Sequence, residues 1–475
     1  MQGRKMRPKY DFDFLCIGSG PASQRAAVQA AKRGKRVAVV ERNRDVGGVC
    51  LHKGTIPSKT FREAVLSFSN GHNSHGDHQA PRNGFGYGAA PSAEQLFARV
   101  AAIEERETRV LEDQLARNNV GFIHGTASFK DPHSLAVRSD DHHQVVSASK
   151  IFIGVGTRPV RPEGVPATDA LVITSDEVLQ LKELPRSMIV VGCGVVGIEY
   201  ASMFANFGVQ VTVVDARQRP LEFLDTEIVD ELIHQMRDRN VRFHLGERVS
   251  HFEISRKGPR RSIVYLESGK KLVKDLVLFS TGRVGSTDAL NLEVAGLTSD
   301  SHGRIKVNRR FRTKVPHIYA GGDVIGYPSL AATSSEQGRL AACHAFGIEA
   351  KPMAEHFPIG VYSIPEASMV GAAEQTLTER KIPYETGVAR YREIARGQIM
   401  GDNSGFLKLL FHREDQRLLG VHAIGTGATE LIHIGQTVLG LGGGLDYFLE
   451  TVFNYPTLAE CYKVAALDAY NKLFA

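Results

Sequence analysis

The chain has 475 residues, of which 42% are hydrophobic and 23% charged, and it carries a formal net charge of +6. A chain of this length is too long to fold around one hydrophobic core, so about two to four domains are expected. The composition excludes a disordered or fibrous protein. No apolar run reaches the roughly 18 residues of a membrane span, and no long run of lysine or arginine indicates a nucleic-acid partner.

The basic segment before residue 11 leads directly into a strand-like run, so a secretory signal is not expected. Five cysteines, at positions 16, 50, 193, 343 and 461, form neither a disulfide framework nor a metal-ligand spacing. We therefore predict reduced thiols, no metal site and a cytoplasmic location.

The first predicted element is a strand over residues 13–17, and the turn after it is typical of a dinucleotide site. Gly18 and Gly20 hold the first two glycine positions, and Ser23 holds the third small position. The next strand, RVAVVE, ends in Glu41. The first glycine makes the turn, the second lets a pyrophosphate approach a helix N-terminus, and the acid binds ribose hydroxyls.

The same unit recurs at IVVGCGVVG, with Gly192, Gly194 and Gly197, followed by a strand that ends in Asp215. The spacing from first glycine to acid is identical, 41 − 18 = 23 and 215 − 192 = 23. Because each motif has a preceding strand, a helix-like run and a correctly spaced acid, we predict an α/β fold with two Rossmann-like domains.

Two arginines, Arg217 and Arg219, follow Asp215. An acid here favours the free 2′-hydroxyl of NAD, whereas nearby arginines accommodate the 2′-phosphate of NADP. The loop therefore predicts a site that accepts either nucleotide. For each arginine, a solvated surface charge is the alternative.

Further segments extend the pattern: GGVCLHKGTIPSK at 47–59, GTRP at 156–159, STGR at 280–283 and YAGGDVIG at 319–326. With them the sequence resembles the FAD-dependent pyridine nucleotide–disulfide oxidoreductases, the family of lipoamide dehydrogenase and glutathione reductase, over almost the whole chain. The resemblance implies FAD as cofactor, NAD and NADP as substrates, and a C-terminal α+β dimerisation domain.

The resemblance also implies residue roles. Lys59 looks like the family lysine beside flavin N5, and Glu199 like the acid that pairs with it, so these two are expected to be catalytic. Glu41 would hold the adenosine ribose, and Asp323 the ribityl chain. The other positions expected at the cofactor sites are Gly18, Gly20, Gly48, Cys50, Thr55, Gly156, Gly192, Gly194, Gly197, Asp215, Arg217, Gly282, Gly322 and Tyr455.

Two positions depart from the family pattern. Cys50 would begin the redox disulfide, but its partner position holds Thr55, which can neither bond to a sulfur nor act as a thiolate. Tyr455 replaces a histidine that serves thiol chemistry, and its ordinary pKa of about 10 does not suit a proton shuttle. Cys50 is then a packing residue, a remnant or a redox-sensitive thiol. Tyr455 either makes a structural hydrogen bond, such as one to Glu460, or shapes the far side of the flavin.

Both changes remove only thiol chemistry. The resemblance is therefore to those members of the family that transfer hydride between NADPH and NAD through the flavin. It implies that both nucleotides use one nicotinamide site in a ping-pong reaction. An NAD(P)H diaphorase or quinone reductase on the same scaffold is the alternative. A disulfide reductase is disfavoured by Thr55 and Tyr455, and a non-enzymatic redox sensor by the intact lysine and glutamate.

Four segments are predicted along the chain. An FAD-binding domain occupies residues 1–155 and resumes at 285–350, an NAD(P)-binding domain occupies 156–284, and a dimerisation domain with strand-like FLKLLFH and LLGVHAIG occupies 351–475. In relatives the partner's C-terminal segment helps to close the active site, so a homodimer at least is expected. The stretch from 70 to 90, with His72, His75 and His78, is predicted to be a surface loop.

Overall fold

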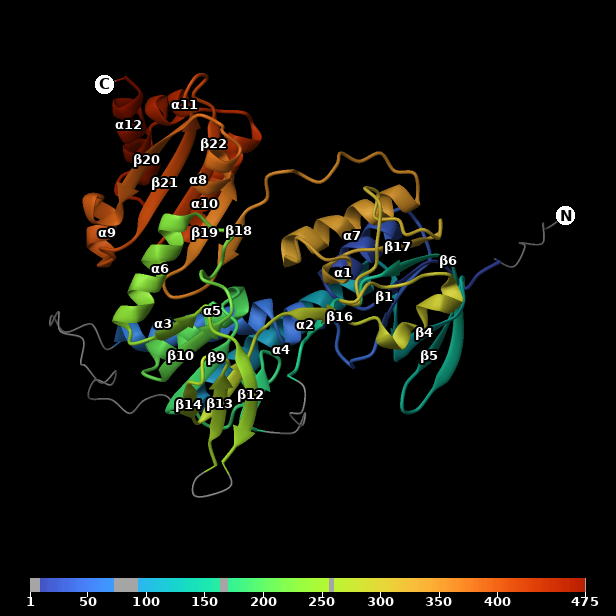
Figure 1. Cartoon of the computed structure of the whole chain (residues 1–475). Coiled ribbons are helices and arrows are strands. Elements are labelled where there is room, and N and C mark those ends of the chain that lie inside the picture. Colours follow the sequence, from blue (N-terminus) through green and yellow to red (C-terminus); the bar gives the residue numbers. More distant parts are fainter. Residues whose placement is uncertain (1–8, 72–92, 163–169, 256–259, 475) are drawn as a thin grey trace.

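The computed structural model describes residues 9–71, 93–162, 170–255 and 260–474, and these form three packed units (Figure 1). The three histidines of the predicted loop at 70–90 lie outside the described residues. No helix in the described part of the chain is long and apolar enough to cross a membrane.

The first unit is built on a seven-stranded sheet whose central strands run parallel. Burial on both faces explains why residues 14–17 of strand β1 (Phe12–Ile17) and residues 37–40 of strand β2 (Val37–Glu41) are continuous apolar runs instead of alternating ones. In spatial order the strands are β3 (Val120–His124), β2 (Val37–Glu41), β1 (Phe12–Ile17), β6 (His143–Ile153), β5 (Ser134–Arg138) and β4 (Thr126–Asp131), and β17 (Ile318–Ala320) pairs with β6.

Helices cover this sheet and lead away from it. Helix α1 begins directly after Gly20 with Pro21 in its first turn, where a missing N–H is tolerated. It packs against α7, which comes from far along the chain. The helices of this unit are α1 (Pro21–Ala31), α2 (Gly48–His52), α3 (Thr55–Gly71), α4 (Ala93–Arg117) and α7 (Ala331–Ala345).

The central unit repeats the arrangement with a parallel sheet of five strands. Helices α5 (Val195–Asn206) and α6 (Thr226–Asp238) cover one face, and a three-stranded antiparallel sheet packs on the other. The parallel strands are β11 (Arg242–Leu245), β10 (Gln210–Asp215), β9 (Ser187–Val191), β15 (Leu276–Phe279) and β8 (Val172–Thr174). The antiparallel strands are β12 (Val249–Ile254), β13 (Ser262–Leu266) and β14 (Lys271–Lys274).

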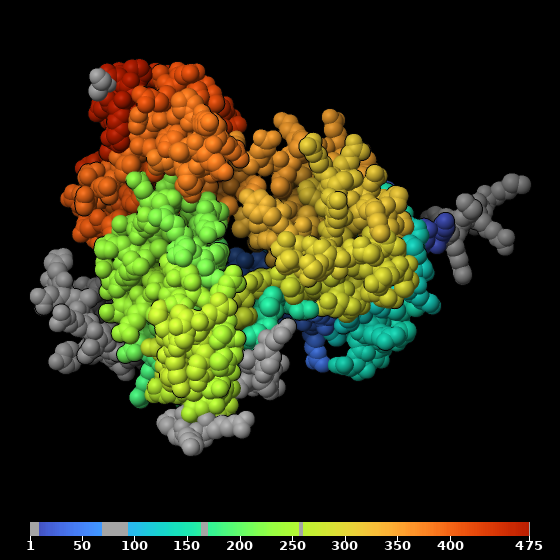
Figure 2. Space-filling view, in the orientation of Figure 1, coloured from blue at the N-terminus to red at the C-terminus, as the bar shows by residue number. Residues whose placement is uncertain are grey.

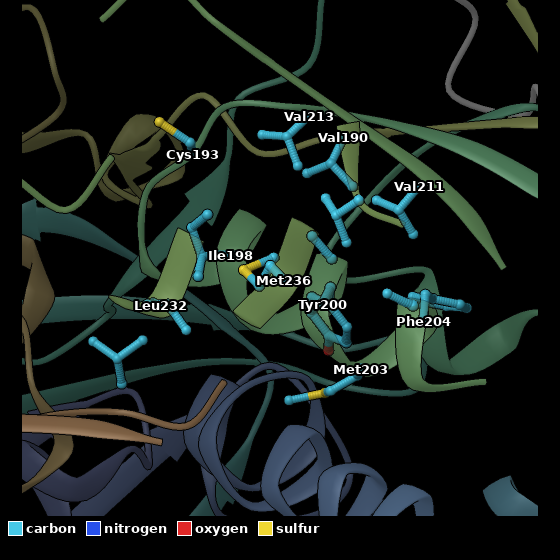
Figure 3. Packing of buried hydrophobic residues seen from close by; sticks show 14 of the residues in the cluster. Val190, Cys193, Ile198, Tyr200, Met203, Phe204, Val211, Val213, Leu232 and Met236 are labelled. Carbon is cyan, nitrogen blue, oxygen red and sulfur yellow. The ribbon is translucent and has the colours of Figure 1, made fainter. Parts of the chain in front are cut away.

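The core of the central unit lies between these two helices and the sheet. Figure 3 shows Ile198 and Phe204 of α5 and Met236 of α6 among valines of the strands. These side chains are essentially inaccessible to solvent. Apolar burial of this extent is the main stabilising contribution and fixes α5 on the sheet.

The C-terminal unit is an antiparallel sheet with helices, as the strand-like FLKLLFH and LLGVHAIG predict. Its strands are β18 (Ile359–Val361), β19 (Ala367–Gly371), β22 (Leu418–Ile424), β21 (Phe406–His412) and β20 (Tyr384–Arg390). Its helices are α8 (Glu374–Glu379), α9 (Ala395–Met400), α10 (Ala428–Gly440), α11 (Leu445–Glu450) and α12 (Glu460–Phe474).

The three units meet around a hollow. In Figure 2 the C-terminal unit (orange to red) rests on the green part of the central unit, and blue N-terminal residues are visible in the hollow beside the yellow segment. Two short strands, β7 (Thr157–Pro159) and β16 (Arg283–Gly285), pair antiparallel where the chain passes between the first two units. The described residues also form short 3₁₀ helices: η1 (Val178–Gln180), η2 (Asp288–Leu290), η3 (Leu292–Ala295), η4 (Asp323–Ile325) and η5 (Tyr391–Glu393).

Candidate active site

A cleft opens where β1, β2 and β6 end. Parallel pairing places Ile17 beside Val40 and Ile153, so the turns after these strands meet at one edge of the sheet. The cleft contains about 1150 Å³ of empty space, part of it open to solvent. Nine of the predicted cofactor-binding residues line it: Gly18, Gly20, Glu41, Gly48, Cys50, Thr55, Gly156, Gly322 and Asp323.

Two glycines shape the turn between β1 and α1. Gly18 has a φ of +90°, and a Cβ there would lie 2.5 Å from the carbonyl oxygen of Gly154, so only glycine fits. Gly20 is extended, and a Cβ there would meet no atom within 4 Å. The backbone is therefore open at the start of α1, where unpaired N–H groups can bind a phosphate. This cradle fits the pyrophosphate of FAD.

Glu41 ends β2 and lies buried beside this turn. Its Oε2 accepts hydrogen bonds from the amide and hydroxyl of Ser19 at 2.9 and 2.8 Å, and its Oε1 accepts one from the Asn43 amide at 2.9 Å. These donors fix the carboxylate in the cleft wall, which is the position a ribose-binding acid requires.

Asp323 belongs to a polar chain that connects the cleft to β7 and β16. Thr157 Oγ1 donates to Asp323 Oδ2 at 3.2 Å, and Arg283 Nε donates to Thr157 Oγ1 at 2.9 Å. Burial raises the pKa of Asp323, while Arg283 and Thr157 oppose the shift. The positive charge of Arg283 therefore favours the ionised form of the buried Asp323 carboxylate.

Cys50 in α2 and Thr55 at the start of α3 face each other in the cleft. Burial raises the pKa of the Cys50 thiol, and the Thr55 side chain opposes the shift. All five cysteines lie among the described residues and are free thiols. The cleft thus presents one sulfur opposite a hydroxyl.

Lys59 and Glu199 form an ion pair between the first two units. Nζ of Lys59 lies 2.7 Å from Oε2 of Glu199, whose side chain is 5% exposed. The other oxygen, Oε1, accepts a hydrogen bond from the Tyr362 amide at 2.8 Å. Lys59 follows Thr55 by one turn of α3, so the two lie on the same helix face beside the cleft.

The second glycine turn has the geometry of the first. Gly192 has a φ of +102°, and a Cβ there would lie 2.5 Å from the carbonyl oxygen of Ser280. Gly194 is extended at the start of α5 and open, whereas a Cβ on Gly197 would lie 1.9 Å from the Gly192 carbonyl oxygen. Gly282 lies two residues beyond Ser280, after the neighbouring strand. A second dinucleotide cradle is therefore present at α5.

Asp215 ends β10 and is bound through both oxygens. Arg217 donates to it from Nε at 3.0 Å and from Nη2 at 2.8 Å, and the Cys193 amide donates at 2.6 Å. Burial alone would raise the pKa of Asp215, but these donors hold it well below its ordinary value. Arg217 is thus paired with Asp215, although its side chain is 43% exposed. Arg219 does pair at the surface, with Asp230.

Tyr455 lies apart from both cradles, between α11 and α12, and its side chain is 69% exposed. Oε2 of Glu460 is buried and has no hydrogen-bond partner among the described residues. The described residues show no hydrogen bond between this oxygen and Tyr455, and the role of Tyr455 stays a prediction. Tyr455 is also not among the residues that line the cleft of its own chain.

The site contains residues that the sequence motifs do not single out. Ser19 and Asn43 orient Glu41. Both are polar residues next to or near a predicted site residue in the sequence, and this proximity is the signal that could have identified them. Arg283 and Thr157 stand inside the STGR and GTRP segments. Tyr362 had no such signal, because its role depends on the packing of a distant unit.

Two family models match the chain. The model of pyridine nucleotide-disulphide oxidoreductases covers residues 12–338, and that of their dimerisation domain covers residues 357–466. The chain belongs to the pyridine nucleotide-disulphide oxidoreductase family. The predicted fold class, two Rossmann-like domains with a C-terminal α+β domain, is thereby confirmed.

Relatives within the family match over nearly the full length. The soluble pyridine nucleotide transhydrogenase of Mycobacterium tuberculosis is 51% identical over 469 residues, covering 98% of each chain. That of Photobacterium profundum is 44% identical over 472 residues, again covering 98% of each. The predicted resemblance to the hydride-passing members of the family is confirmed by this similarity.

Solved structures of the family share the fold. The flavoprotein disulfide reductase RclA from Escherichia coli, in its Cu(II) complex, is 28% identical with a TM-score of 0.86, covering 97% of this chain and 99% of that one. LpdA from Mycobacterium tuberculosis is 25% identical with a TM-score of 0.86, covering 97% and 100%.

Proposed function

We propose that this protein is an FAD-dependent enzyme that transfers hydride between NADPH and NAD. The observation that carries the proposal is the pairing of Cys50 with Thr55, because a redox disulfide needs two sulfurs at this place. Similarity over 98% of the chain to soluble pyridine nucleotide transhydrogenases supports the same activity.

FAD would occupy the first cleft. The open backbone at Gly20 suits its pyrophosphate, Glu41 its adenosine ribose, and Asp323 its ribityl chain. When bound, FAD supplies a ring that takes up and releases a hydride. Lys59 would place a positive charge beside that ring, and Glu199 would hold the ammonium in place.

NADPH and NAD would use the second cradle in turn. Gly194 leaves the N-terminus of α5 open to a pyrophosphate. Asp215 would accept a hydrogen bond from the ribose 2′-hydroxyl of NAD, whereas Arg217, turned away from Asp215, would bind the 2′-phosphate of NADP. Because both substrates compete for one place, ping-pong kinetics are expected.

No protein thiol relays electrons in this proposal. Cys50 would be dispensable for turnover, and Tyr455 would not serve as a thiol base. Its exposed position between α11 and α12 instead suits contact with a second copy of the chain.

Steady-state rates with NADPH as donor test the proposal, with thio-NAD as the acceptor. Rapid formation of thio-NADH with parallel double-reciprocal plots is expected. A quinone used with a higher kcat/KM than thio-NAD would instead establish the diaphorase alternative. Nucleotide binding without turnover on either acceptor would indicate a redox sensor.

We also propose that the protein is at least a homodimer in the cytoplasm. The match of residues 357–466 to the family's dimerisation domain supports self-association. Several apolar side chains on this unit are exposed in the single chain, among them Leu441 and Val452 at 83% and 91%. Large exposed apolar patches mark interaction sites.

A further inference from the structure

Tyr362 of the C-terminal unit contacts both members of the Lys59–Glu199 pair. Its amide donates to Glu199 Oε1 at 2.8 Å, and Nζ of Lys59 lies 4.8 Å from the centroid of its ring. An ammonium within about 6 Å of an aromatic face is attracted by the negative charge of that face. One residue therefore holds the carboxylate through its backbone and the ammonium through its ring.

The segment that carries Tyr362 is attached to α5. The Ile364 amide donates to Ser202 Oγ at 3.0 Å, one turn beyond Glu199. The backbone that carries the ring is thus held to α5 at Tyr362 and at Ile364.

The same segment is attached to α3, one turn beyond Lys59. Arg62 is buried, and its Nη2 lies 3.1 Å from Glu366 Oε1, while its Nε donates to the Ser363 carbonyl oxygen at 3.0 Å. A buried, hydrogen-bonded arginine–carboxylate pair has a fixed geometry. The ring of Tyr362 is therefore held at a set position relative to Lys59.

The ring restrains the ammonium without neutralising it. Glu199 Oε2 and Ser58 Oγ lie 2.7 and 3.3 Å from Nζ of Lys59, and an ammonium has three N–H donors. Glu199 already balances the charge of Lys59, so a second carboxylate in the place of the ring would leave the cluster with a net negative charge. An aromatic face attracts the ammonium while adding no net charge.

We propose that Tyr362 is a positioning residue that sets the place of the Lys59 ammonium through the face of its ring. The inference rests on the proposed function in that FAD is the group beside which the ammonium is held. Positive charge held there favours the more negative, reduced state of the cofactor. Loss of the ring is therefore expected to make bound FAD harder to reduce.

The test compares two substitutions by redox titration of the FAD-bound protein. Tyr362→Leu removes the ring, and the equilibrium for reduction of bound FAD is expected to fall about tenfold, which is about 30 mV for two electrons. Tyr362→Phe keeps the ring and loses only the hydroxyl, so its potential should stay close to the parent value. Equal shifts in both variants would overturn the proposal.

The Lys59→Met background shows whether Tyr362 acts through Lys59. In that background, Tyr362→Leu should cause no further shift in potential, because the charge that the ring positions is absent. The same shift with and without Lys59 would mean that Tyr362 acts by another route, and this result would overturn the proposal.

A second probe covers the case in which the leucine variant does not fold. Replacement of Tyr362 by pentafluorophenylalanine keeps a ring of similar shape and inverts the charge of its face. It should lower the potential as leucine does, and an unchanged potential would overturn the proposal. These titrations need no nicotinamide turnover. A protein that shows the expected pattern yet forms no thio-NADH would therefore contradict the proposed activity and support the role of Tyr362.

Discussion

At the scale of single residues, the site depends on which groups are charged and which are not. Burial raises the pKa of the Cys50 thiol, so it is protonated at neutral pH and has no second sulfur to bond to. We predict that Cys50→Ser keeps most of the NADPH to thio-NAD turnover, measured at steady state. Near-complete loss of turnover would contradict this prediction.

The same thiol gives a pH prediction. Because its pKa lies above the ordinary value of about 8.5, alkylation of Cys50 by iodoacetamide should accelerate only at alkaline pH. Thr55→Val removes the hydroxyl that opposes the rise in this pKa, so labelling of that variant should be slower still at a given pH. Mass spectrometry of the labelled peptide measures both rates. Fast labelling at pH 7 would show that the thiol is activated.

Arg217 is expected to decide how well NADPH binds. Arg217→Ala removes the guanidinium that pairs with Asp215, so the negative Asp215 carboxylate alone would face the 2′-phosphate of NADPH. A hydrogen bond to a charged group contributes about 1.5–3 kcal/mol, so the KM for NADPH should rise roughly 10- to 100-fold while that for NAD changes little. Arg219→Ala, at the surface pair with Asp230, is the matched control. An equal effect in the control, or on both nucleotides, would count against the assignment.

At the scale of elements, a buried lysine joins the central and C-terminal units. Lys408 of β21 is 1% exposed. Its Nζ lies 3.1 Å from Asp225 Oδ1 and 2.9 Å from Glu227 Oε2. It also forms an ion pair with Glu374. Asp225 caps the N-terminus of α6, and Glu374 begins α8. The three carboxylates are close enough together to bind a metal ion, but here an ammonium lies among them.

We predict that Lys408→Met lowers the free energy of unfolding by about 3–5 kcal/mol, because it leaves the buried Asp225 charge unpaired. Urea unfolding measures the change. Lys472→Met is the control, since its pair with Asp468 is exposed and should contribute less than about 1 kcal/mol. Similar losses in the two variants would contradict the structural role of Lys408.

Asp225 should also make stability depend on pH. Burial alone would raise the pKa of Asp225, but His422 and Lys408 hold it below its ordinary value. Its stabilising contribution is therefore present above about pH 4 and is lost as the pH falls through the folded-state pKa. Asp225→Asn, which keeps a capping side chain, should be less stable than the parent at pH 7 and approach it in acid. A stability difference that does not change with pH would argue against this charge effect.

At the scale of the whole molecule, local patterns predicted the fold well because each is complete within one strand, turn and helix. The two glycine turns and their acids are of this kind, and so are Cys50 and Thr55. The partners that complete the site come from distant segments. Tyr362 lies 163 positions from Glu199, and Lys408 lies 183 positions from Asp225. Such contacts depend on how the units pack, which hydrophobic periodicity does not encode.

The exposed apolar side chains of the C-terminal unit predict self-association. Light scattering of the FAD-bound protein should give twice the 52.0 kDa of one chain, or a multiple of that. Val452→Glu should weaken the assembly, because Val452 is 91% exposed in the single chain and a charge disfavours an apolar interface. Val273→Glu, on β14 of the central unit, is the control. A stable monomer in the parent protein would contradict the prediction.

The central claim is that reducing equivalents from NADPH return to a nicotinamide and not to a sulfur. One reaction mixture tests it directly: purified protein with NADPH and equal concentrations of NAD, lipoamide and glutathione disulfide, assayed for NADH and for free thiol. We predict that NADH accumulates while free thiol stays at the level of the protein-free control. Thiol formed in place of NADH would contradict the account.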